Sequence, residues 1–235
     1  MRLLHPGPPR SLDLDALTAL YLTDRTRAHL RANFVTSLDG AVAIDGSSRP
    51  LSGPADRRLL GLLRMLCDAL LVGAGTLRRE DYRPLTLSEE RRRWREERGL
   101  TPYPRLVVVS GRLALDPRQR ALAGAPVRPL VLTGTTSGKL DTVADVVEVR
   151  DLGAAVATLQ ESYPLVLSEG GPQLFTALQR AGKVDELCLT LSPLLAGPGA
   201  GRIVAGEPVA TPRQMALRHV VEADDGALLL RYTRI

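Results

Sequence analysis

Short apolar runs of strand length alternate along the chain with segments whose apolar positions recur at helical spacing. The strand-like runs lie at residues 32–37, 69–72, 105–110, 130–133, 146–149, 165–168 and 187–191. Several are continuously apolar rather than alternating, which is typical of strands buried on both faces. Such strands belong to a mostly parallel sheet covered by helices, so the pattern predicts an α/β domain of three layers.

Helices are predicted between these strands, and the one that begins at Pro54 has the clearest signals. Proline suits a first helical turn, and Leu59, Leu62, Leu63 and Leu66 recur on one face. The other predicted helices cover residues 88–98, residues 153–162 and the segment with Leu174, Phe175 and Leu178 before Gly182.

The two ends of the chain depart from this alternation. Residues 215–221 and 227–232 flank Asp224-Asp225-Gly226, which is the signature of an antiparallel hairpin. The first thirty residues are a proline-rich lead followed by a short helix. We therefore divide the chain into an N-terminal extension, residues 1–30, and a single domain, residues 31–235, a size that one core can support.

The net charge of +5 does not by itself indicate a nucleic-acid-binding protein. In the densest basic run, Arg92/Glu96 and Arg93/Glu97 stand at the i,i+4 spacing of ion pairs on a helix. A solvated helix face is therefore predicted there, with no nucleic-acid partner. No apolar run approaches the roughly 18 residues of a membrane helix, so a cytoplasmic protein without a membrane partner is expected.

The two cysteines, Cys67 and Cys188, lie in apolar segments far apart in the sequence. Because no pair has CxxC spacing, the sequence indicates neither a redox dithiol nor a zinc site, and no metal is expected. Both thiols are predicted to be buried core groups rather than nucleophiles.

Two glycine-rich loops follow predicted strands and are candidates for binding a phosphate. In Glu169-Gly170-Gly171-Pro172 the glycines would let a phosphate approach the backbone, and Pro172 opens a helix whose N-terminus attracts anions. A plain turn is the alternative, but Glu169 favours a functional loop because its carboxylate could bind a substrate hydroxyl or ring nitrogen. Gly73-Ala74-Gly75-Thr76 has fewer glycines than GxGxxG and no clearly placed acid about twenty residues later, which argues against a Rossmann dehydrogenase.

Ser110-Gly111-Arg112 and Asp39 each leave two interpretations open. A hydroxyl beside a guanidinium suits a phosphate monoester such as the 2′-phosphate of NADP, and a simple surface turn fits these residues equally well. Asp39 precedes Gly40, and Asp-Gly is a common turn pair. As a functional residue, Asp39 would be an acid beside the substrate at the end of the first strand.

A set of short motifs recurs in a fixed order along the chain, at residues 37–40, 51–57, 63–64, 67–76, 80–81, 107–110, 167–171, 184–187 and 193–197. In that order they resemble the C-terminal reductase domain of the bifunctional deaminase/reductase of riboflavin biosynthesis. The resemblance covers about residues 32–232. It implies a dihydrofolate reductase-like three-layer α/β/α fold with a C-terminal antiparallel hairpin, and a homodimer.

The resemblance also implies an activity and a set of site residues. The activity is NADPH-dependent reduction of the ribosyl group of 5-amino-6-(5-phosphoribosylamino)uracil to ribityl, by hydride transfer to C1′. The residues expected at NADPH are Thr36, Gly73, Gly75, Thr76, Glu80, Ser110, Arg112, Gly170, Gly171 and Pro172. Those expected at the substrate are Ser48, Arg64, Leu85 and Glu169, with Asp39 and Glu169 as catalytic candidates. Arg64 would meet the ribosyl phosphate or chain oxygens, and a snorkelling surface arginine is the alternative.

Two departures from the family pattern concern the substrate. The family's Asp-Asp-Pro run has one extra residue here, in the segment 80–84. The arginine that the family places shortly after a Leu-Thr pair is missing after Leu85-Thr86, and Arg83 or Arg91 are the candidate substitutes. The PCxxC and HxE elements of the zinc deaminase are absent from the sequence, so a stand-alone reductase is expected.

Two other functions remain as alternatives. One is another NADPH-dependent reductase of the same fold, such as a folate reductase, for which the first long helix offers only Asp56 as the acid that would meet a pterin. The other is a non-catalytic NADPH-binding module.

Overall fold

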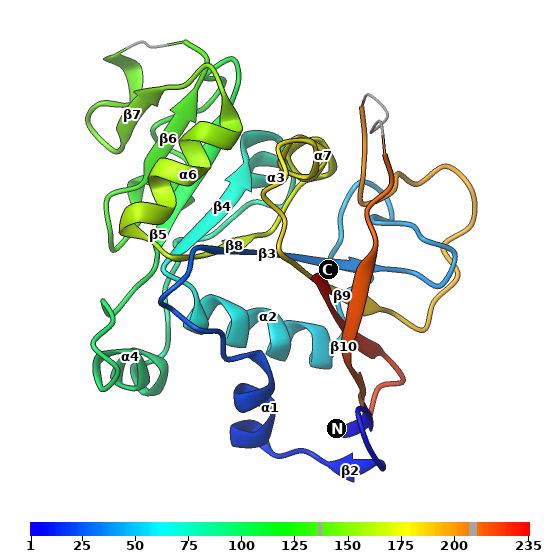
Figure 1. The fold of residues 1–235 in the computed structure, drawn as a ribbon. Coiled ribbons are helices and arrows are strands. Elements are labelled where there is room, and N and C mark those ends of the chain that lie inside the picture. Colours follow the sequence, from blue (N-terminus) through cyan, green and yellow to red (C-terminus); the bar gives the residue numbers. More distant parts are fainter. Residues whose placement is uncertain (136–137, 207–210) are drawn as a thin grey trace.

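The computed structural model of the chain describes residues 1–135, 138–206 and 211–235. Within these ranges one sheet has the strand order β2-β1-β10-β11-β9-β3-β8-β4-β5-β6-β7 (Figure 1). Its strands are β1 (Arg2–His5), β2 (Arg10–Ser11), β3 (His29–Thr36), β4 (Ala69–Gly73), β5 (Arg105–Ser110), β6 (Leu130–Thr133), β7 (Asp145–Glu148), β8 (Leu165–Ser168), β9 (Glu186–Leu191), β10 (Met215–Glu222) and β11 (Leu228–Arg234). The helices are α1 (Leu14–Tyr21), α2 (Pro54–Leu66), α3 (Ala74–Arg79), α4 (Glu89–Glu96), α5 (Arg120–Ala123), α6 (Leu152–Ser162) and α7 (Pro172–Arg180), with a 3₁₀ turn at Gly138–Leu140.

Strands β9, β3, β8, β4, β5, β6 and β7 are parallel neighbours, whereas β10 and β11 form the C-terminal antiparallel hairpin. The predicted α/β fold, with a mostly parallel sheet and this hairpin, is confirmed. Burial on both faces explains the continuous apolar runs, since all four residues from Ala69 to Val72 are 0% exposed. Parallel strands place their carboxyl ends at one edge, so the loops after β3, β8, β4 and β5 share that edge.

Helices cover both faces of the sheet, with one hydrophobic core on each side (Figure 1). On one face α1 and α2 contribute Leu17, Leu59 and Leu63. On the other face α6 and α7 contribute Val156 and Leu178. The predicted three layers follow from this arrangement.

The N-terminal segment contains two strands that the sequence pattern did not predict. β1 pairs with both β2 and β10, and so extends the sheet beyond the hairpin. Both strands are too short, and too close to prolines, to show a strand pattern. The predicted short helix is α1, and Leu3 and Leu17, each 2% exposed, lie in the core on the α2 face.

Helix α4 forms where it was predicted, with the Ser88 hydroxyl accepting a hydrogen bond at its N-terminus, but its arginines behave differently from the prediction. Neither Arg92/Glu96 nor Arg93/Glu97 is an ion pair among the described residues; Arg93 pairs with Glu89 instead, at 3.0 Å. Arg95 is 0% exposed rather than solvated. Its guanidinium donates to the Met65 and Cys67 carbonyls at 2.7 and 2.6 Å, and so caps the C-terminal end of α2.

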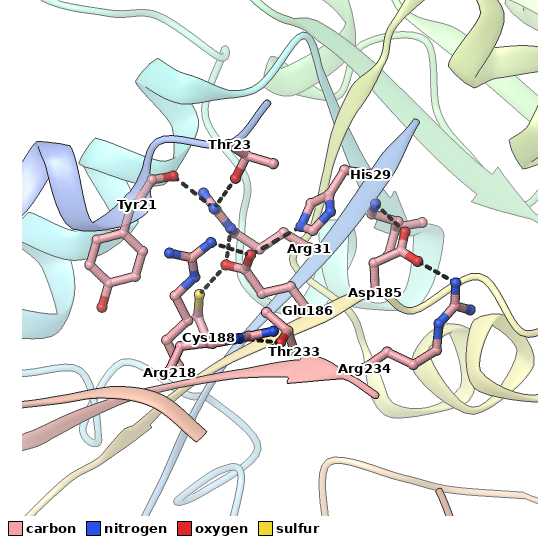
Figure 2. A network of polar contacts seen from close by, with 12 residues as sticks. Tyr21, Thr23, His29, Arg31, Asp185, Glu186, Cys188, Arg218, Thr233 and Arg234 are labelled. Atoms are coloured by element: carbon pink, nitrogen blue, oxygen red, sulfur yellow. Dashed lines mark hydrogen bonds and ion pairs between the residues drawn. The ribbon is translucent and has the colours of Figure 1, made fainter. Parts of the chain in front are cut away.

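Glu186 is the centre of a buried polar network at the amino end of β9 (Figure 2). Its carboxylate, 0% exposed, accepts hydrogen bonds from Arg31 and, at 2.8 Å, from Arg231, and lies 3.0 Å from His29 Nε2. Burial alone would raise the pKa of Glu186, but the charge of Arg31 and the neighbouring donors lower it well below its ordinary value. Arg31 also donates to the Tyr21 carbonyl at 2.8 Å, so the network ties α1 to the sheet.

Both cysteines are buried and free, as predicted. Burial raises the pKa of the Cys67 thiol to about 12 and raises that of Cys188 as well, so neither is a thiolate at neutral pH. Within the described ranges no helix combines the length and apolarity needed to cross a membrane.

His219 of β10 makes the stability of the fold depend on pH. It is 2% exposed, and its ring meets the Tyr21 ring edge-on with centroids 4.7 Å apart. Burial lowers its pKa from 6.5 to about 4, and the charge of Arg231 acts in the same direction. As the pH falls, the unfolded chain therefore binds a proton at His219 near pH 6.5, whereas the folded chain binds it only near pH 4. The contribution of the neutral His219 to the unfolding free energy is complete above pH 6.5 and is lost as the pH falls toward 4.

We expect His219→Phe, which keeps a ring against Tyr21, to flatten this dependence. Between pH 6.5 and 5 the wild type should lose up to about 1.4 kcal/mol of unfolding free energy per pH unit more than the variant. Urea denaturation at several pH values measures the unfolding free energy of both proteins. Parallel pH profiles for wild type and His219→Phe would contradict the assignment.

Candidate active site

The two glycine-rich loops lie side by side at the carboxyl edge of the parallel strands, after β8 and β4 (Figure 1). The Gly73 N–H donates to the Gly170 carbonyl at 2.8 Å, and the Glu169 N–H donates to the Leu71 carbonyl at 3.1 Å. Ser110 ends the next strand, β5. The structure therefore brings together the loops that the sequence indicated as candidate anion and substrate sites.

Glu169, Arg64 and Tyr82 form a compact polar group beside these loops. Arg64 Nε and Nη2 each donate to one oxygen of the Glu169 carboxylate, both at 2.6 Å, and the Tyr82 hydroxyl donates to Oε2 at 2.6 Å. The Glu169 side chain is 5% exposed, whereas that of Arg64 is 29% exposed. Such a bidentate, charge-assisted pair fixes the position of the carboxylate.

The pKa values of Arg64 and Tyr82 are both raised within this group. Burial alone would lower the pKa of Arg64, but the charge of Glu169 raises it above its ordinary value. Burial and the charge of Glu169 both raise the pKa of Tyr82, so its hydroxyl keeps its proton and acts as a donor. Sequence reasoning did not find Tyr82, and its place in the departing segment 80–84 was the only signal.

Two helices begin at this edge without a side-chain cap, α3 after Gly73 and α7 after Gly171. The N-termini of α1, α4 and α6 are capped by the side chains of Asp13, Ser88 and Asp151, whereas those of α2 and α5, like α3 and α7, have no side-chain cap. Uncapped helix N-termini present free N–H groups and the positive end of the helix dipole. Both glycine loops are therefore suited to bind phosphate oxygens.

The backbone at the start of α7 has room only for glycine. Gly170 has φ of 78°, and a Cβ there would lie 2.8 Å from the Phe34 ring. A Cβ on Gly171 would lie 2.5 Å from Thr76 Oγ1 and 3.9 Å from Arg79 Nη2. Thr76 and the exposed Arg79 guanidinium thus lie directly beside the Gly171 backbone, next to Pro172 at the first position of α7.

Ser48 and Glu80, which were assigned to substrate and cofactor respectively, contact each other. The Glu80 carboxylate accepts from the Ser48 N–H at 2.8 Å and from the Ser47 hydroxyl at 3.0 Å. Arg49 donates to the Glu80 carbonyl at 2.6 Å. Glu80 therefore anchors the segment between β3 and α2 over the end of α3.

Asp39 holds a second loop in the same way. Its carboxylate accepts hydrogen bonds from the Ser37 hydroxyl and from the Ala196 and Gly197 N–H groups, the last two at 3.2 and 2.8 Å. These bonds, first that of Ser37, lower its pKa. The geometry gives Asp39 a loop-anchoring role, and its catalytic role stays a prediction.

The remaining candidate residues differ in how exposed they are near the carboxyl edge of the parallel strands. Thr36 is 5% exposed at the end of β3, and Ser110 is 4% exposed at the end of β5, followed by the exposed Arg112. Leu85, also 5% exposed, packs in the core on the α2 face and offers a substrate little surface. Arg91, a candidate for the missing phosphate ligand, packs its guanidinium against Gly61 of α2. No group of three or more metal-ligating side chains occurs in the part of the chain that the structure describes.

Comparison with protein families gives one match that covers most of the chain. Residues 28–229 match the family described as the RibD C-terminal domain. The first 27 residues, with β1, β2 and α1, lie outside the matched region.

Known proteins are similar to the chain in sequence and in structure. The chain is 30% identical over 183 residues to the 2,5-diamino-6-ribosylamino-4(3H)-pyrimidinone 5′-phosphate reductase of Archaeoglobus fulgidus, covering 73% of this chain and 83% of that protein. It is 29% identical over 170 residues to riboflavin biosynthesis protein RibD of Mycobacterium tuberculosis, covering 72% of this chain and 43% of that protein. The crystal structure of a pyrimidine reductase-like protein from Corynebacterium diphtheriae superposes with a TM-score of 0.79 at 26% identity, covering 88% of this chain and 92% of that one.

Proposed function

Because the chain belongs to the RibD C-terminal domain family, we propose that it is an NADPH-dependent reductase of riboflavin biosynthesis, which converts the ribosyl group of a ribosylaminopyrimidine 5′-phosphate to ribityl. The observation that carries the proposal is the Arg64–Glu169–Tyr82 group beside two uncapped helix N-termini. It offers a fixed carboxylate for a polar substrate next to a cradle for a dinucleotide.

The residues of the two glycine loops fit a dinucleotide. The free N–H groups at the starts of α3 and α7 suit a pyrophosphate, and the Arg79 guanidinium beside Gly171 adds a positive charge. A bound nicotinamide would supply the hydride. The chain itself would contribute binding and orientation, so most of the catalysis would come from positioning.

On the substrate side, Glu169 has the defining role. Arg64 and Tyr82 hold its carboxylate in one orientation and leave a lone pair on Oε1, which could accept from a hydroxyl of the ring-opened sugar or from a pyrimidine N–H. Ser48 lies on the segment that Glu80 anchors nearby. A sugar chain bound to this carboxylate would be held in one orientation for the reduction.

The activity is tested by NADPH oxidation with two ribosylaminopyrimidine 5′-phosphates, one carrying a 2-amino group and one a uracil, beside dihydrofolate. We expect turnover of at least one ribosylaminopyrimidine with ribityl product identified by mass spectrometry. Turnover of dihydrofolate alone would favour a folate reductase. NADPH binding with no turnover of any of the three would favour a non-catalytic module.

We also expect NADPH to bind more tightly than NADH. Ser110 and the exposed Arg112 after β5 suit a 2′-phosphate, and each charge-assisted hydrogen bond is worth about 1.5–3 kcal/mol. Calorimetry with both cofactors measures the preference, and Arg112→Ala should reduce it. Arg78 serves as the control position because its guanidinium is already bonded to the Ala114 carbonyl. Equal binding of the two cofactors by the wild type would exclude a 2′-phosphate site here.

Gly171→Val should weaken NADPH binding at least tenfold, because its Cβ would lie 2.5 Å from Thr76 Oγ1 and so displace Thr76 or the start of α7. Gly201→Val is the control, since a Cβ at Gly201 makes only an ordinary 3.8 Å contact. Cofactor affinity is measured by NADPH fluorescence, after circular dichroism has shown that both variants are folded. A folded Gly171→Val with wild-type NADPH affinity would contradict the assignment of this loop to the cofactor pyrophosphate.

A further inference from the structure

The two oxygens of the Glu169 carboxylate differ in how many hydrogen bonds they already accept. Oε2 accepts from Arg64 Nη2 and from the Tyr82 hydroxyl, both at 2.6 Å, and these two bonds use its two lone pairs. Oε1 accepts only from Arg64 Nε, at 2.6 Å, within the part of the chain that the structure describes. A donor group of a bound substrate can therefore bind this carboxylate only at Oε1.

Tyr82 is the source of this difference between the two oxygens. Arg64 by itself treats them alike, because its Nε and Nη2 donate one hydrogen bond to each. Without the Tyr82 hydroxyl, each oxygen would keep one free lone pair. A substrate hydroxyl or N–H could then bind the same carboxylate at two positions.

The end of α3 places Tyr82 beside the carboxylate. The Tyr82 N–H donates to the Leu77 carbonyl at 3.2 Å and the Asp81 N–H donates to the Arg78 carbonyl at 3.4 Å, which is the bond pattern of a Schellman motif. Asp81 has the left-handed backbone that this motif requires, with φ of 46°. The turn directs Tyr82 back onto the core on the α2 face, which also contains Leu77.

The ring and the proton of Tyr82 are fixed as well as its backbone. The Arg64 guanidinium lies over the ring, with Cζ 5.6 Å from the ring centroid. Burial and the charge of Glu169 raise the pKa of Tyr82, so the hydroxyl keeps its proton and donates it to Oε2. Tyr82 belongs to the segment 80–84, in which the sequence departs from the family pattern.

Resting on the proposed function, we propose that Tyr82 is a positioning residue that occupies Oε2 of Glu169, so that the substrate binds this carboxylate through Oε1 and in one orientation only. A misplacement of about 1 Å can cost on the order of 100-fold in rate. A substrate bound at Oε2 would therefore be displaced from the hydride donor and unproductive. The role of Tyr82 is to exclude this second binding mode, not to add binding energy.

An excluded binding mode has a kinetic signature of its own. When a substrate also binds unproductively, kcat and KM fall by the same factor. Their ratio stays constant, because the productive route from free enzyme and substrate to the transition state is unchanged. Equal affinity for the two orientations would lower both constants about twofold, and a tighter unproductive mode would lower both further. Loss of a contact that stabilises the transition state would instead lower kcat/KM.

Tyr82→Phe is the test, because it removes only the hydroxyl and keeps the ring against the core and Arg64. For the ribosylaminopyrimidine 5′-phosphate, kcat and KM should both fall about twofold or more, with kcat/KM within about 1.5-fold of wild type. NADPH affinity should be unchanged. Tyr163→Phe is the matched control, because the Tyr163 hydroxyl accepts from Arg105 at 3.3 Å at the C-terminal end of α6. It should keep both constants at their wild-type values.

The complex with NADP and the ribityl product provides a second measurement, which does not depend on a rate. With ¹³C at C1′ of the product, the wild type should give one bound NMR signal. Tyr82→Phe should give two signals, one for each carboxylate oxygen, or one broadened signal if the two orientations exchange quickly. A single sharp signal at the wild-type position would show that the second orientation is not populated and would overturn the proposal.

The kinetic outcomes also separate this proposal from the reductase function itself. A fall in kcat/KM with KM unchanged or raised would make Tyr82 part of the contact with the transition state and would overturn the proposed role. Wild-type values of both kcat and KM in a folded Tyr82→Phe would overturn it too. Absence of turnover by the wild-type chain would instead defeat the reductase function, whatever the variant does.

Discussion

Replacing Glu186 with alanine should lower the free energy of unfolding by about 3–5 kcal/mol, the typical cost of removing one partner from a buried ion pair. The Glu186 carboxylate is 0% exposed and bonds to Arg31 and Arg231, whose side chains are 8% and 14% exposed. Without it, the guanidinium groups of Arg31 and Arg231, which both donate to this carboxylate, would remain in the interior with no anion between them. Chemical denaturation in urea at pH 7.5 measures the loss.

A surface ion pair provides the comparison. Arg2 and Glu222 lie 2.7 Å apart between β1 and β10, but their side chains are 57% and 40% exposed. Glu222→Ala should therefore cost no more than about 1 kcal/mol. Losses of similar size in the two variants would mean that burial does not distinguish these pairs and that Glu186 is not the organising charge of the network.

The parallel part of the sheet could be predicted from the sequence because burial on both faces leaves a direct mark on composition. Runs such as residues 69–72 and 165–168 have the length and the apolar composition of buried strands, and turn residues bound them on each side. The segments of β1 and β2 contain no such apolar run. They form only because the edge of β10 is available, and that contact joins residues about 220 positions apart.

In the candidate site, too, local features could be predicted from the sequence and contacts between distant segments could not. Glycine loops and helix starts are local features, so the loops after β4 and β8 could be identified as candidates. Hydrogen bonds between side chains from distant segments could not be predicted in this way. The bond from Tyr82 to Glu169 joins residues 87 positions apart, and the capping of α2 by Arg95 joins residues 30 positions apart.

Glu169→Gln should lower kcat/KM for the ribosylaminopyrimidine phosphate at least tenfold, equivalent to about 1.4 kcal/mol, and leave NADPH affinity nearly unchanged. The amide keeps the size of the side chain but removes the charge that Arg64 and Tyr82 hold in place. Steady-state kinetics gives the first quantity and NADPH fluorescence the second. A variant that loses only NADPH affinity would move Glu169 from the substrate to the cofactor.

Arg64→Ala should lower kcat/KM by a comparable factor, and the reason can be separated experimentally. The guanidinium uses Nε and Nη2 on Glu169, so we expect it to act by positioning that carboxylate rather than by gripping the substrate phosphate. The loss should then be the same for phosphorylated and dephosphorylated substrates. The double variant Arg64→Ala/Glu169→Gln should be little worse than either single one, because the two residues work as a unit.

The sequence-based alternative, in which Arg64 binds the ribosyl phosphate, makes the opposite prediction on both counts. The loss of kcat/KM would be confined to the phosphorylated substrate. The effects of the two substitutions on kcat/KM would multiply, because each removes an independent contact. Unfolding measurements accompany the kinetics, since Arg64→Ala leaves a carboxylate of 5% exposure without its cation and should also destabilise the fold. Wild-type kinetics in a stably folded Arg64→Ala would exclude both roles and leave Tyr82 as the only side chain in the described structure that holds Glu169 in place.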